Sequence, residues 1–125
     1  MVLPSALSTR VQLEVAETDT APAFASGDVP VLATPRVVAL CEQAAAAALK
    51  GHLEDGQTSV GFRVELTHLA PALVGSTVVA SATLDRLEGR RATITVTVTD
   101  KCGLIAAGRF VRVIVDRAAF MEKAR

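Results

Sequence analysis

Two patterns of hydrophobic residues divide this chain: one nearly continuous apolar stretch, and several segments in which apolar and polar residues alternate. The apolar stretch runs from Ala33 to Gly51 and reads ATPRVVALCEQAAAAALKG, which is typical of one long buried helix. Thr34 suits the N-cap, Pro35 suits the first helical position, and Gly51 supplies the stop. Because nearly every side chain between these ends is apolar, we expect a helix that a sheet covers almost all round.

Alternation with a period of two predicts five strands around this helix. In the second strand we place the apolar residues from Val60 to Leu66 on one buried face, which His68 continues. The segment from Glu17 to Val31 is rich in Pro, Gly, Asp and Ser, and it predicts a loop that shapes a pocket where it enters the helix. The predicted strands are Thr9 to Val15, Val60 to Leu66, Thr77 to Leu87, Arg91 to Thr99 and Leu104 to Val115.

The predicted order is strand, loop, long helix and then four antiparallel strands joined by short turns, which is an α+β layout. We expect the four strands to form a meander that curls round the single helix, as one domain of residues 1–125. Such a sheet has unpaired edge strands, so pairing with a second copy into one continuous sheet is the expected way to close them. For the tail, Asp116 to Arg125, we expect a short turn or a frayed end.

Composition narrows the classes of function. Half of the residues are hydrophobic but only 3% are aromatic, with no Trp or Tyr, so stacking on nucleic-acid bases is not expected. The 13 acidic residues balance the 13 Lys and Arg residues, which argues against a nucleic-acid binder but is compatible with an anionic small molecule. Cys41 and Cys102 lie far apart with no metal-ligand spacing around them, so we interpret both as free thiols in a reducing compartment.

Targeting and membrane segments are not expected. The first residues, MVLPSALSTR, lack a basic start and a long apolar run, so we predict no signal peptide. The helical stretch is shorter than the ~20 apolar residues of a membrane span, and it is interrupted by Arg36, Glu42 and Gln43. We therefore expect a cytoplasmic protein without a membrane partner.

Three residues are candidates for chemistry: Thr34 at the helix start, Glu42 within the alanine-rich helix, and His68 near the end of the second strand. Each of them alone has a structural explanation. Thr34 is explained as a helix cap, His68 as a satisfied core or edge residue, and Glu42 as the ion-pair partner of an arginine from another subunit. As a set, however, they supply a hydroxyl, an acid and an imidazole, which are the parts of an acyl-transfer site.

The helix start adds a further element to this set. Its free amides and positive dipole end can polarise a thioester carbonyl and stabilise the oxyanion that forms on attack. Eight residues of helix place Thr34 and Glu42 about 12 Å apart along the axis, so the two side chains cannot bond each other within one chain. Either substrate, His68 or water lies between them, or the working set is assembled across a dimer interface.

The pattern of these residues resembles the fluoroacetyl-CoA thioesterase family of hot-dog-fold proteins, over about residues 31–120. The family's threonine, glutamate and histidine fall on Thr34 in ATPRVVALCE, Glu42 at the end of that string and His68 in ELTH, with matching spacings. A family glycine near the thioester matches Gly61, seven residues before the histidine. The turn LEGRR and the spacing from Gly108 to Arg112 in GRFVR match as well.

This resemblance implies a hot-dog fold, in which an antiparallel sheet wraps around one long central helix. It also implies a homodimer, or a higher oligomer, that hydrolyses an acyl-CoA thioester at the subunit interface without cofactor or metal. A small pocket lined by alanines would suit a short acyl group. Thr34 would be the nucleophile or position one, His68 would be the general acid or base, and Glu42 would orient or activate His68, a water or an acyl intermediate. Gly61 would offer a backbone amide to the carbonyl. Arg112 would contact the substrate, with an ion pair on the strand face as its structural alternative.

Asp28 departs from the family pattern, in which a phenylalanine gate stands six residues before the threonine, so the fluoroacyl preference is not carried over. A competing hypothesis is a non-catalytic hot-dog module that binds acyl-CoA or another small apolar anion. A third is another reaction on the same fold, such as hydration of an enoyl thioester, although no hydratase pairing of histidine and aspartate is recognisable. Arg90 and Arg91, at a hairpin tip, are candidates for contact with a nucleotide phosphate, and a solvated turn is their simpler explanation.

Overall fold

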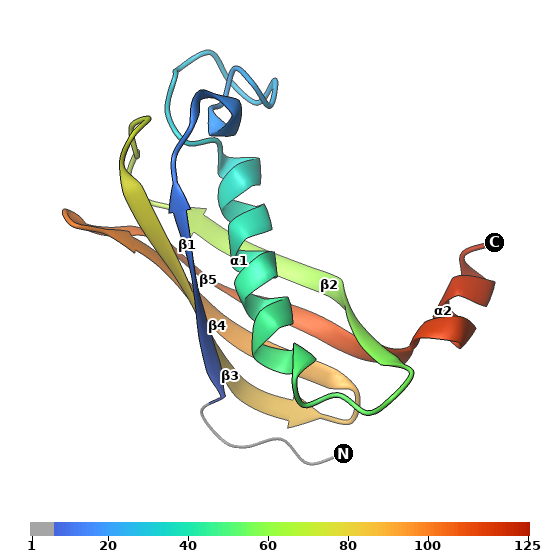
Figure 1. The fold of residues 1–125 in the computed structure, drawn as a ribbon. Coiled ribbons are helices and arrows are strands. Elements are labelled where there is room, and N and C mark those ends of the chain that lie inside the picture. Colours follow the sequence, from blue (N-terminus) through green and yellow to red (C-terminus); the bar gives the residue numbers. More distant parts are fainter. Residues whose placement is uncertain (1–6) are drawn as a thin grey trace.

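The computed structural model describes residues 7–125. A five-stranded antiparallel sheet packs against one side of a single long helix, α1 (Thr34–Lys50). Figure 1 shows α1 lying along the sheet, with β1 at one edge and β2 at the other. This confirms the predicted α+β layout of an antiparallel sheet around one long helix.

Two expectations concern targeting. The predicted absence of a signal peptide rests in part on residues 1–6, which lie outside the described residues. Within residues 7–125, no helix is both long enough and apolar enough to cross a membrane.

All five predicted strands form, and a short helix ends the chain. Asp116 caps this helix by accepting a hydrogen bond from the amide of Ala119 at 2.9 Å, where we expected a turn or a frayed end. The elements in chain order are β1 (Ser8–Glu14), the 3-10 helix η1 (Glu17–Asp19), α1 (Thr34–Lys50), β2 (Gln57–His68), β3 (Thr77–Glu88), β4 (Arg91–Asp100), β5 (Gly103–Asp116) and α2 (Arg117–Lys123).

The order of the strands differs from the predicted meander. β3, β4 and β5 are consecutive neighbours, but β2 pairs with β5 and β1 pairs with β3, which gives the order β1-β3-β4-β5-β2. Residues 69–76, between β2 and β3, cross the end of the sheet, because this segment is longer than the about two to five residues of a tight hairpin. The expectation of four hairpin-linked strands is therefore wrong, and β2 is an edge strand with one free side.

A β-bulge in β2 changes which side chains face the helix. The register between β2 and β5 shifts between Gly61 and Arg63. This extra residue reverses the alternation, so Val60 faces away from α1 while the apolar residues after the bulge face it. The expectation of one buried face from Val60 to Leu66 is therefore wrong, and Phe62 remains 56% exposed.

The core lies between α1 and the helix-facing sides of β3, β4 and β5. Phe110 of β5 is the buried aromatic residue of this core. Nearby, Gly108 allows β5 to approach β2 closely, because a Cβ at this position would overlap the backbone carbonyl of Glu65. Four alternating apolar residues of β4 are fully buried in this core: Ala92, Ile94, Val96 and Val98.

One side of α1 is left uncovered by the sheet. Ala39, Gln43 and Ala47 are exposed, and Glu42 beside them is partly exposed. One sheet layer covers only one side of a helix, so the expectation of a helix covered almost all round is wrong for a single chain. The exposed residues follow a spacing of four and form an open stripe along α1.

Candidate active site

Thr34 begins α1 but does not cap it. The N-cap residue is Ala33, which is extended, and no side chain caps the helix. The hydroxyl of Thr34 instead lies 2.7 Å from Nδ1 of His68. The predicted N-cap role of Thr34 is therefore wrong, because its hydroxyl turns to an imidazole on a distant strand. The first-turn amides remain available to a ligand.

His68 is held by the end of β2. The next two amides, of Leu69 and Ala70, donate to the carbonyl of Ile105 at 2.7 and 3.1 Å. Nδ1 of His68 takes part in the bond to Thr34, whereas Nε2 is buried and has no hydrogen-bond partner among the described residues. A buried nitrogen without a partner costs about 1–3 kcal/mol, and proteins accept such a cost more readily at a catalytic side chain.

The contact between these two side chains has a clear chemical use. When Nδ1 is unprotonated, the Thr34 hydroxyl donates to it, and the imidazole can accept the proton as the oxygen attacks an electrophile. The electrophile would then lie at the positive end of α1, where negative charge is stabilised. We call Thr34 and His68 the hydroxyl–imidazole pair.

An ion pair that the sequence pattern did not indicate holds the start of α1 in place. Arg36 Nε donates to Asp19 Oδ1 at 2.9 Å, and both side chains are largely buried. The other carboxylate oxygen accepts from the amide of Ala16 at 2.8 Å, and the Asp19 carbonyl accepts from the amide of Ala33. Asp19 thus ties the loop before the helix to its first turn and orients Thr34. The available signal was a charge, Arg36, in an otherwise apolar stretch.

The hydroxyl–imidazole pair lines a cavity of about 370 Å³ between the loop before α1 and the end of β2. The rest of the lining is mostly small or apolar and includes Leu32 and Ala70. Asp28 is the acidic residue of this lining and is exposed. A carboxylate therefore lines the same cavity as the hydroxyl and the imidazole, at the sequence position where the family resemblance implies an aromatic gate.

Glu42, Gly61 and Arg112 form a second group, which we call the Glu42 cluster. Arg112 Nη1 lies 3.7 Å from Glu42 Oε2, and Arg112 also donates to the hydroxyl and the carbonyl of Ser59, both at 2.9 Å. The ion pair considered for Arg112 is thus present. Gly61 leaves room for the carboxylate, because a Cβ at this position would lie 2.7 Å from Glu42 Oε2.

The charges of the Glu42 cluster sit at the boundary between core and solvent. Burial lowers the pKa of Arg112 from its ordinary value, and the nearby Glu42 carboxylate opposes this lowering. The Glu42 side chain is 39% exposed, whereas that of Arg112 is 11% exposed. The carboxylate can therefore meet a ligand or a second subunit while the guanidinium holds it from behind.

The chain brings Thr34 and His68 together but leaves Glu42 apart from them. The lining of the cavity at the hydroxyl–imidazole pair does not include Glu42, Gly61 or Arg112. Gly61 and His68 are seven residues apart on β2, which corresponds to roughly 20 Å at about 3.3 Å per residue. One chain therefore holds two separate groups of candidate residues, the hydroxyl–imidazole pair with its cavity and the Glu42 cluster.

The two cysteines are free thiols, as expected, with Cys41 buried and Cys102 exposed. Burial raises the pKa of the Cys41 thiol to about 12, so this side chain is a core residue and not a candidate nucleophile near neutral pH. In the described part of the chain, no group of three or more His, Cys, Asp or Glu is placed to hold a metal ion.

Known proteins are similar to this chain in both sequence and fold. The family model for fluoroacetyl-CoA-specific thioesterase matches residues 15–118. The fluoroacetyl-CoA thioesterase of Streptantibioticus cattleyicolor is 35% identical over 95 residues, which cover 76% of this chain and 68% of that protein.

Solved structures extend the likeness to the whole described fold. A structure of the fluoroacetyl-CoA thioesterase FlK matches with a TM-score of 0.90 at 29% identity, covering 100% of this chain and 97% of that chain. A variant of the same enzyme, in complex with fluoroacetate and CoA, matches with a TM-score of 0.86 at 29% identity, covering 94% and 99% of the two chains. A hot-dog-like protein from Thermanaerovibrio acidaminovorans matches with a TM-score of 0.90 at 30% identity, covering 97% and 90%. The expected hot-dog fold is confirmed.

Proposed function

Because this chain belongs to the fluoroacetyl-CoA-specific thioesterase family and is a thioester hydrolase, we propose that it cleaves short-chain acyl-CoA thioesters at the cavity lined by Thr34 and His68. The observation that carries this proposal is the 2.7 Å contact between the Thr34 hydroxyl and His68 Nδ1 at the start of α1. Such a pair activates a hydroxyl for attack on an acyl carbon, and it needs no cofactor to do so.

In the proposed mechanism, Nδ1 of His68 takes the hydroxyl proton as the Thr34 oxygen attacks the thioester carbonyl carbon. The first-turn amides and the positive end of α1 stabilise the charge that develops on the carbonyl oxygen. The carbon–sulfur bond then breaks. The sulfur takes the proton from His68, and CoA leaves as the free thiol. A water molecule that His68 deprotonates attacks the Thr34 ester. The carboxylic acid is released, and His68 returns the proton to the Thr34 oxygen.

A second copy of the chain would complete each site in this proposal. β2 has a free edge, and the large apolar side chains of Phe62 and Val64 are exposed on this strand. β2 can pair antiparallel with the same strand of a partner about a two-fold axis near Val64. The start of one strand then lies beside the end of the other. Because Gly61 and His68 lie on either side of Val64, this axis brings Gly61 of the partner subunit toward the hydroxyl–imidazole pair.

The Glu42 cluster then supplies the groups that the cavity lacks. Glu42 of the partner subunit would orient the attacking water or the acyl intermediate, and the Gly61 amide would approach the carbonyl. Arg112 would keep the carboxylate in place through the ion pair at 3.7 Å. The same pairing would cover the open stripe of α1 and the free edge of β2.

The cavity favours a small acyl group without negative charge. Its lining is mostly small or apolar, and its volume of about 370 Å³ has to hold the thioester as well as the acyl chain. The Asp28 carboxylate, which lines the same cavity, would repel an anionic acyl group. We therefore assign a short, uncharged acyl chain. The cytoplasmic location and the single domain of residues 1–125 remain predictions from the sequence.

Release of free thiol from a panel of acyl-CoAs tests the proposed function. We expect turnover to be fastest for the shortest uncharged acyl groups, slower for long chains, and slower for malonyl-CoA than for acetyl-CoA. Binding of CoA without thiol release from any member would contradict the proposal and support the non-catalytic module. Hydration of an enoyl-CoA without thiol release would support the third hypothesis instead.

Gly61→Ala is expected to impair catalysis more than folding. The added methyl group would lie 2.7 Å from Glu42 Oε2, and the flexible, partly exposed carboxylate would move away from Arg112. We expect the free energy of unfolding to change by less than about 1 kcal/mol, and kcat/KM to fall by about 10-fold or more. Gly51→Ala is the matched control, because Gly51 has a φ of −74° and open space around it. Equal activity in the two variants would contradict the role of Gly61.

A further inference from the structure

The short helix α2 has no role in the mechanism above, and its own chain leaves it almost uncovered. α2 has 7 residues, none of which is buried. Isolated helices shorter than about 12–15 residues are marginal in water, so their stability comes mainly from packing against another element. Phe120 and Met121 of α2 are 38% and 50% exposed. α2 therefore carries a large apolar surface that lacks a partner within residues 7–125.

α2 lies at the start of β2. The amide of Arg117 donates to the carbonyl of Gly56, directly before β2, at 2.9 Å. Figure 1 shows α2 at this end of β2, far from the loop that precedes α1. Gln57 begins β2 and Leu69 directly follows it, which places them about 40 Å apart at about 3.3 Å per residue. α2 therefore cannot cover the end of its own β2.

A second group of exposed apolar side chains lies at that far end of β2. Leu69 is 56% exposed and Val29 58%, and both line the cavity at the hydroxyl–imidazole pair. Leu104, which is 45% exposed, is held near Leu69 because the Leu69 amide donates to the carbonyl of Ile105 at 2.7 Å. We call Val29, Leu69 and Leu104 the end patch.

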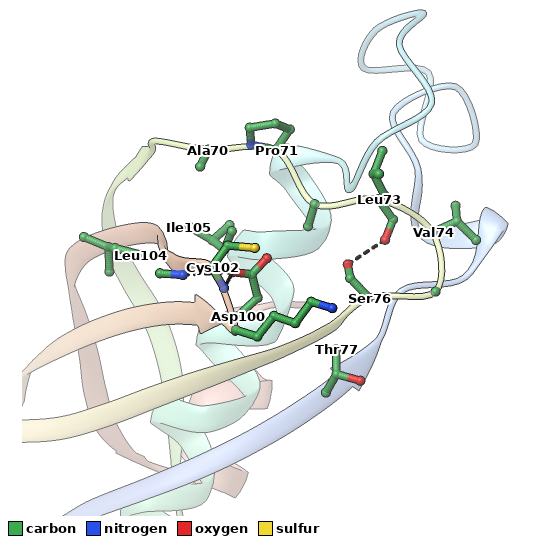
Figure 2. A pocket seen from close by; sticks show the side chains of 14 residues that line it. Ala70, Pro71, Leu73, Val74, Ser76, Thr77, Asp100, Cys102, Leu104 and Ile105 are labelled. Atoms are coloured by element: carbon green, nitrogen blue, oxygen red, sulfur yellow. Dashed lines mark hydrogen bonds between the residues drawn. The ribbon is translucent and has the colours of Figure 1, made fainter.

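The end patch also adjoins a second cavity, of about 640 Å³. Figure 2 shows this cavity between residues 70–77 and 100–105, with Leu104 at one end of it. Ala70 and Pro71 line both this cavity and the cavity at the hydroxyl–imidazole pair. Among the residues that the structure describes, none from α2 lines either cavity. Apolar side chains grouped at the mouth of a cavity are typical of a surface that another molecule covers.

The proposed pairing of β2 with a partner strand brings α2 and the end patch together. In that pairing the start of one β2 lies beside the end of the other. The bond between Arg117 and Gly56 fixes α2 to the start of β2, so α2 of the partner subunit comes beside Leu69. Phe and Met are enriched at the centre of protein interfaces, and α2 presents one of each.

Charges on the two surfaces favour the same arrangement. Arg117 and Lys123 of α2 form no ion pair within residues 7–125, whereas Glu122 pairs with the last residue of the chain at 3.7 Å. The cavity beside the end patch contains the exposed carboxylate of Asp28. Attraction between opposite charges guides docking and needs no direct ion pair, so Asp28 keeps its negative charge in the cavity.

We propose that α2 of the partner subunit covers the end patch and forms a wall of the cavity at the hydroxyl–imidazole pair. Phe120 and Met121 of the partner subunit lie against Leu69 and Val29. This inference rests on the pairing of β2 in the proposed function. The wall excludes water from one side of the cavity and adds an apolar contact to the bound substrate. Each site thus depends on the partner's α2 as well as on its Glu42 cluster.

Cysteine cross-linking tests the contact without any substrate. Leu69→Cys and Met121→Cys are combined in a Cys102→Ser background, because Cys102 is an exposed thiol, and the protein is oxidised with copper phenanthroline. We expect a covalent dimer as the main species on a non-reducing gel. The two positions lie at opposite ends of β2 within one chain, so a disulfide between them has to join two chains.

Two controls exclude other cross-links. Met121→Cys alone should remain monomeric on the gel, because α2 is expected to meet the end patch and not a second α2. Leu69→Cys with Ser8→Cys should also remain monomeric, because Ser8 is exposed on β1 at the opposite edge of the sheet. Both controls use the same Cys102→Ser background.

Phe120→Ser tests the wall itself. Folding should be retained because no residue of α2 is buried. KM for acetyl-CoA should rise by about 10-fold, because an apolar contact of the bound substrate is lost. The value of kcat should change much less, since the hydroxyl–imidazole pair is intact. Phe120→Leu keeps an apolar side chain and should keep KM, and Ala118→Ser, exposed on the same helix, is the matched control.

The two measurements separate this inference from the proposed function. If the wild type hydrolyses no acyl-CoA, the proposed function has failed, but a cross-link between positions 69 and 121 would still support the docking of α2. The inference is overturned if these positions give no more covalent dimer than the controls, even in an active enzyme. Equal KM values for Phe120→Ser and Ala118→Ser would overturn the wall as well.

Discussion

His68→Ala is expected to lower kcat for acyl-CoA hydrolysis by about 10²–10⁴-fold, because the base that contacts the Thr34 hydroxyl is lost. KM should change much less, since most of the cavity lining remains. The free energy of unfolding, followed by thermal melting, should change by only about 1 kcal/mol. The substitution removes the exposed hydrogen bond to Thr34 and, together with it, the unsatisfied Nε2 nitrogen. His52→Ala is the matched control, because His52 is exposed in the turn after α1 and lines neither cavity.

Thr34→Ala should cause a loss of similar size, and combining it with His68→Ala shows whether the two residues act as a unit. The double variant should be no slower than the slower single variant, because each substitution stops the same proton transfer. Losses that multiply would mean that the two side chains act in separate steps, which contradicts the hydroxyl–imidazole pair. Thr34→Ser keeps the hydroxyl and should keep much of the rate.

The long helix and the five strands could be predicted because their signals are local. An apolar stretch and strict alternation indicate burial residue by residue, without knowledge of the partners. Strand order is not local, and nothing within β2 or β3 indicates that residues 69–76 cross the end of the sheet. The bulge at Gly61 is hidden for a similar reason. The alternation of Val60, Phe62, Val64 and Leu66 runs through it unchanged, while the partner strand has one residue fewer.

The candidate residues of the site could be named from the sequence, but their partners could not. A hydroxyl at a helix start and an acid among alanines are visible in one stretch of chain. The contact from Thr34 to His68 spans 34 residues and depends on how β2 lies against α1. Arg36 looked like an interruption of the apolar run, yet its bond to Asp19 fixes the first turn of α1. Groups with chemistry are therefore easier to predict than the groups that position them.

A heterodimer of two inactive variants is expected to regain activity. Thr34→Ala disables the hydroxyl–imidazole pair, and Glu42→Gln removes the carboxylate of the Glu42 cluster, so both homodimers should be nearly inactive. If the Glu42 cluster of the partner subunit completes the cavity, one site of the heterodimer joins an intact Thr34 to an intact Glu42. A heterodimer purified through two different tags should then show about half of the wild-type kcat per dimer, since one of its two symmetric sites is intact.

The heterodimer of Thr34→Ala with His68→Ala is the control, because these two residues contact each other within one chain. Each of its chains carries a broken pair, so it should stay inactive. If Thr34 and Glu42 act within one chain, the heterodimer with Glu42→Gln should also stay inactive, which would contradict the shared site. A monomer in light scattering would exclude the shared site as well. Glu42 would then have to act across the about 12 Å of helix that separates it from Thr34.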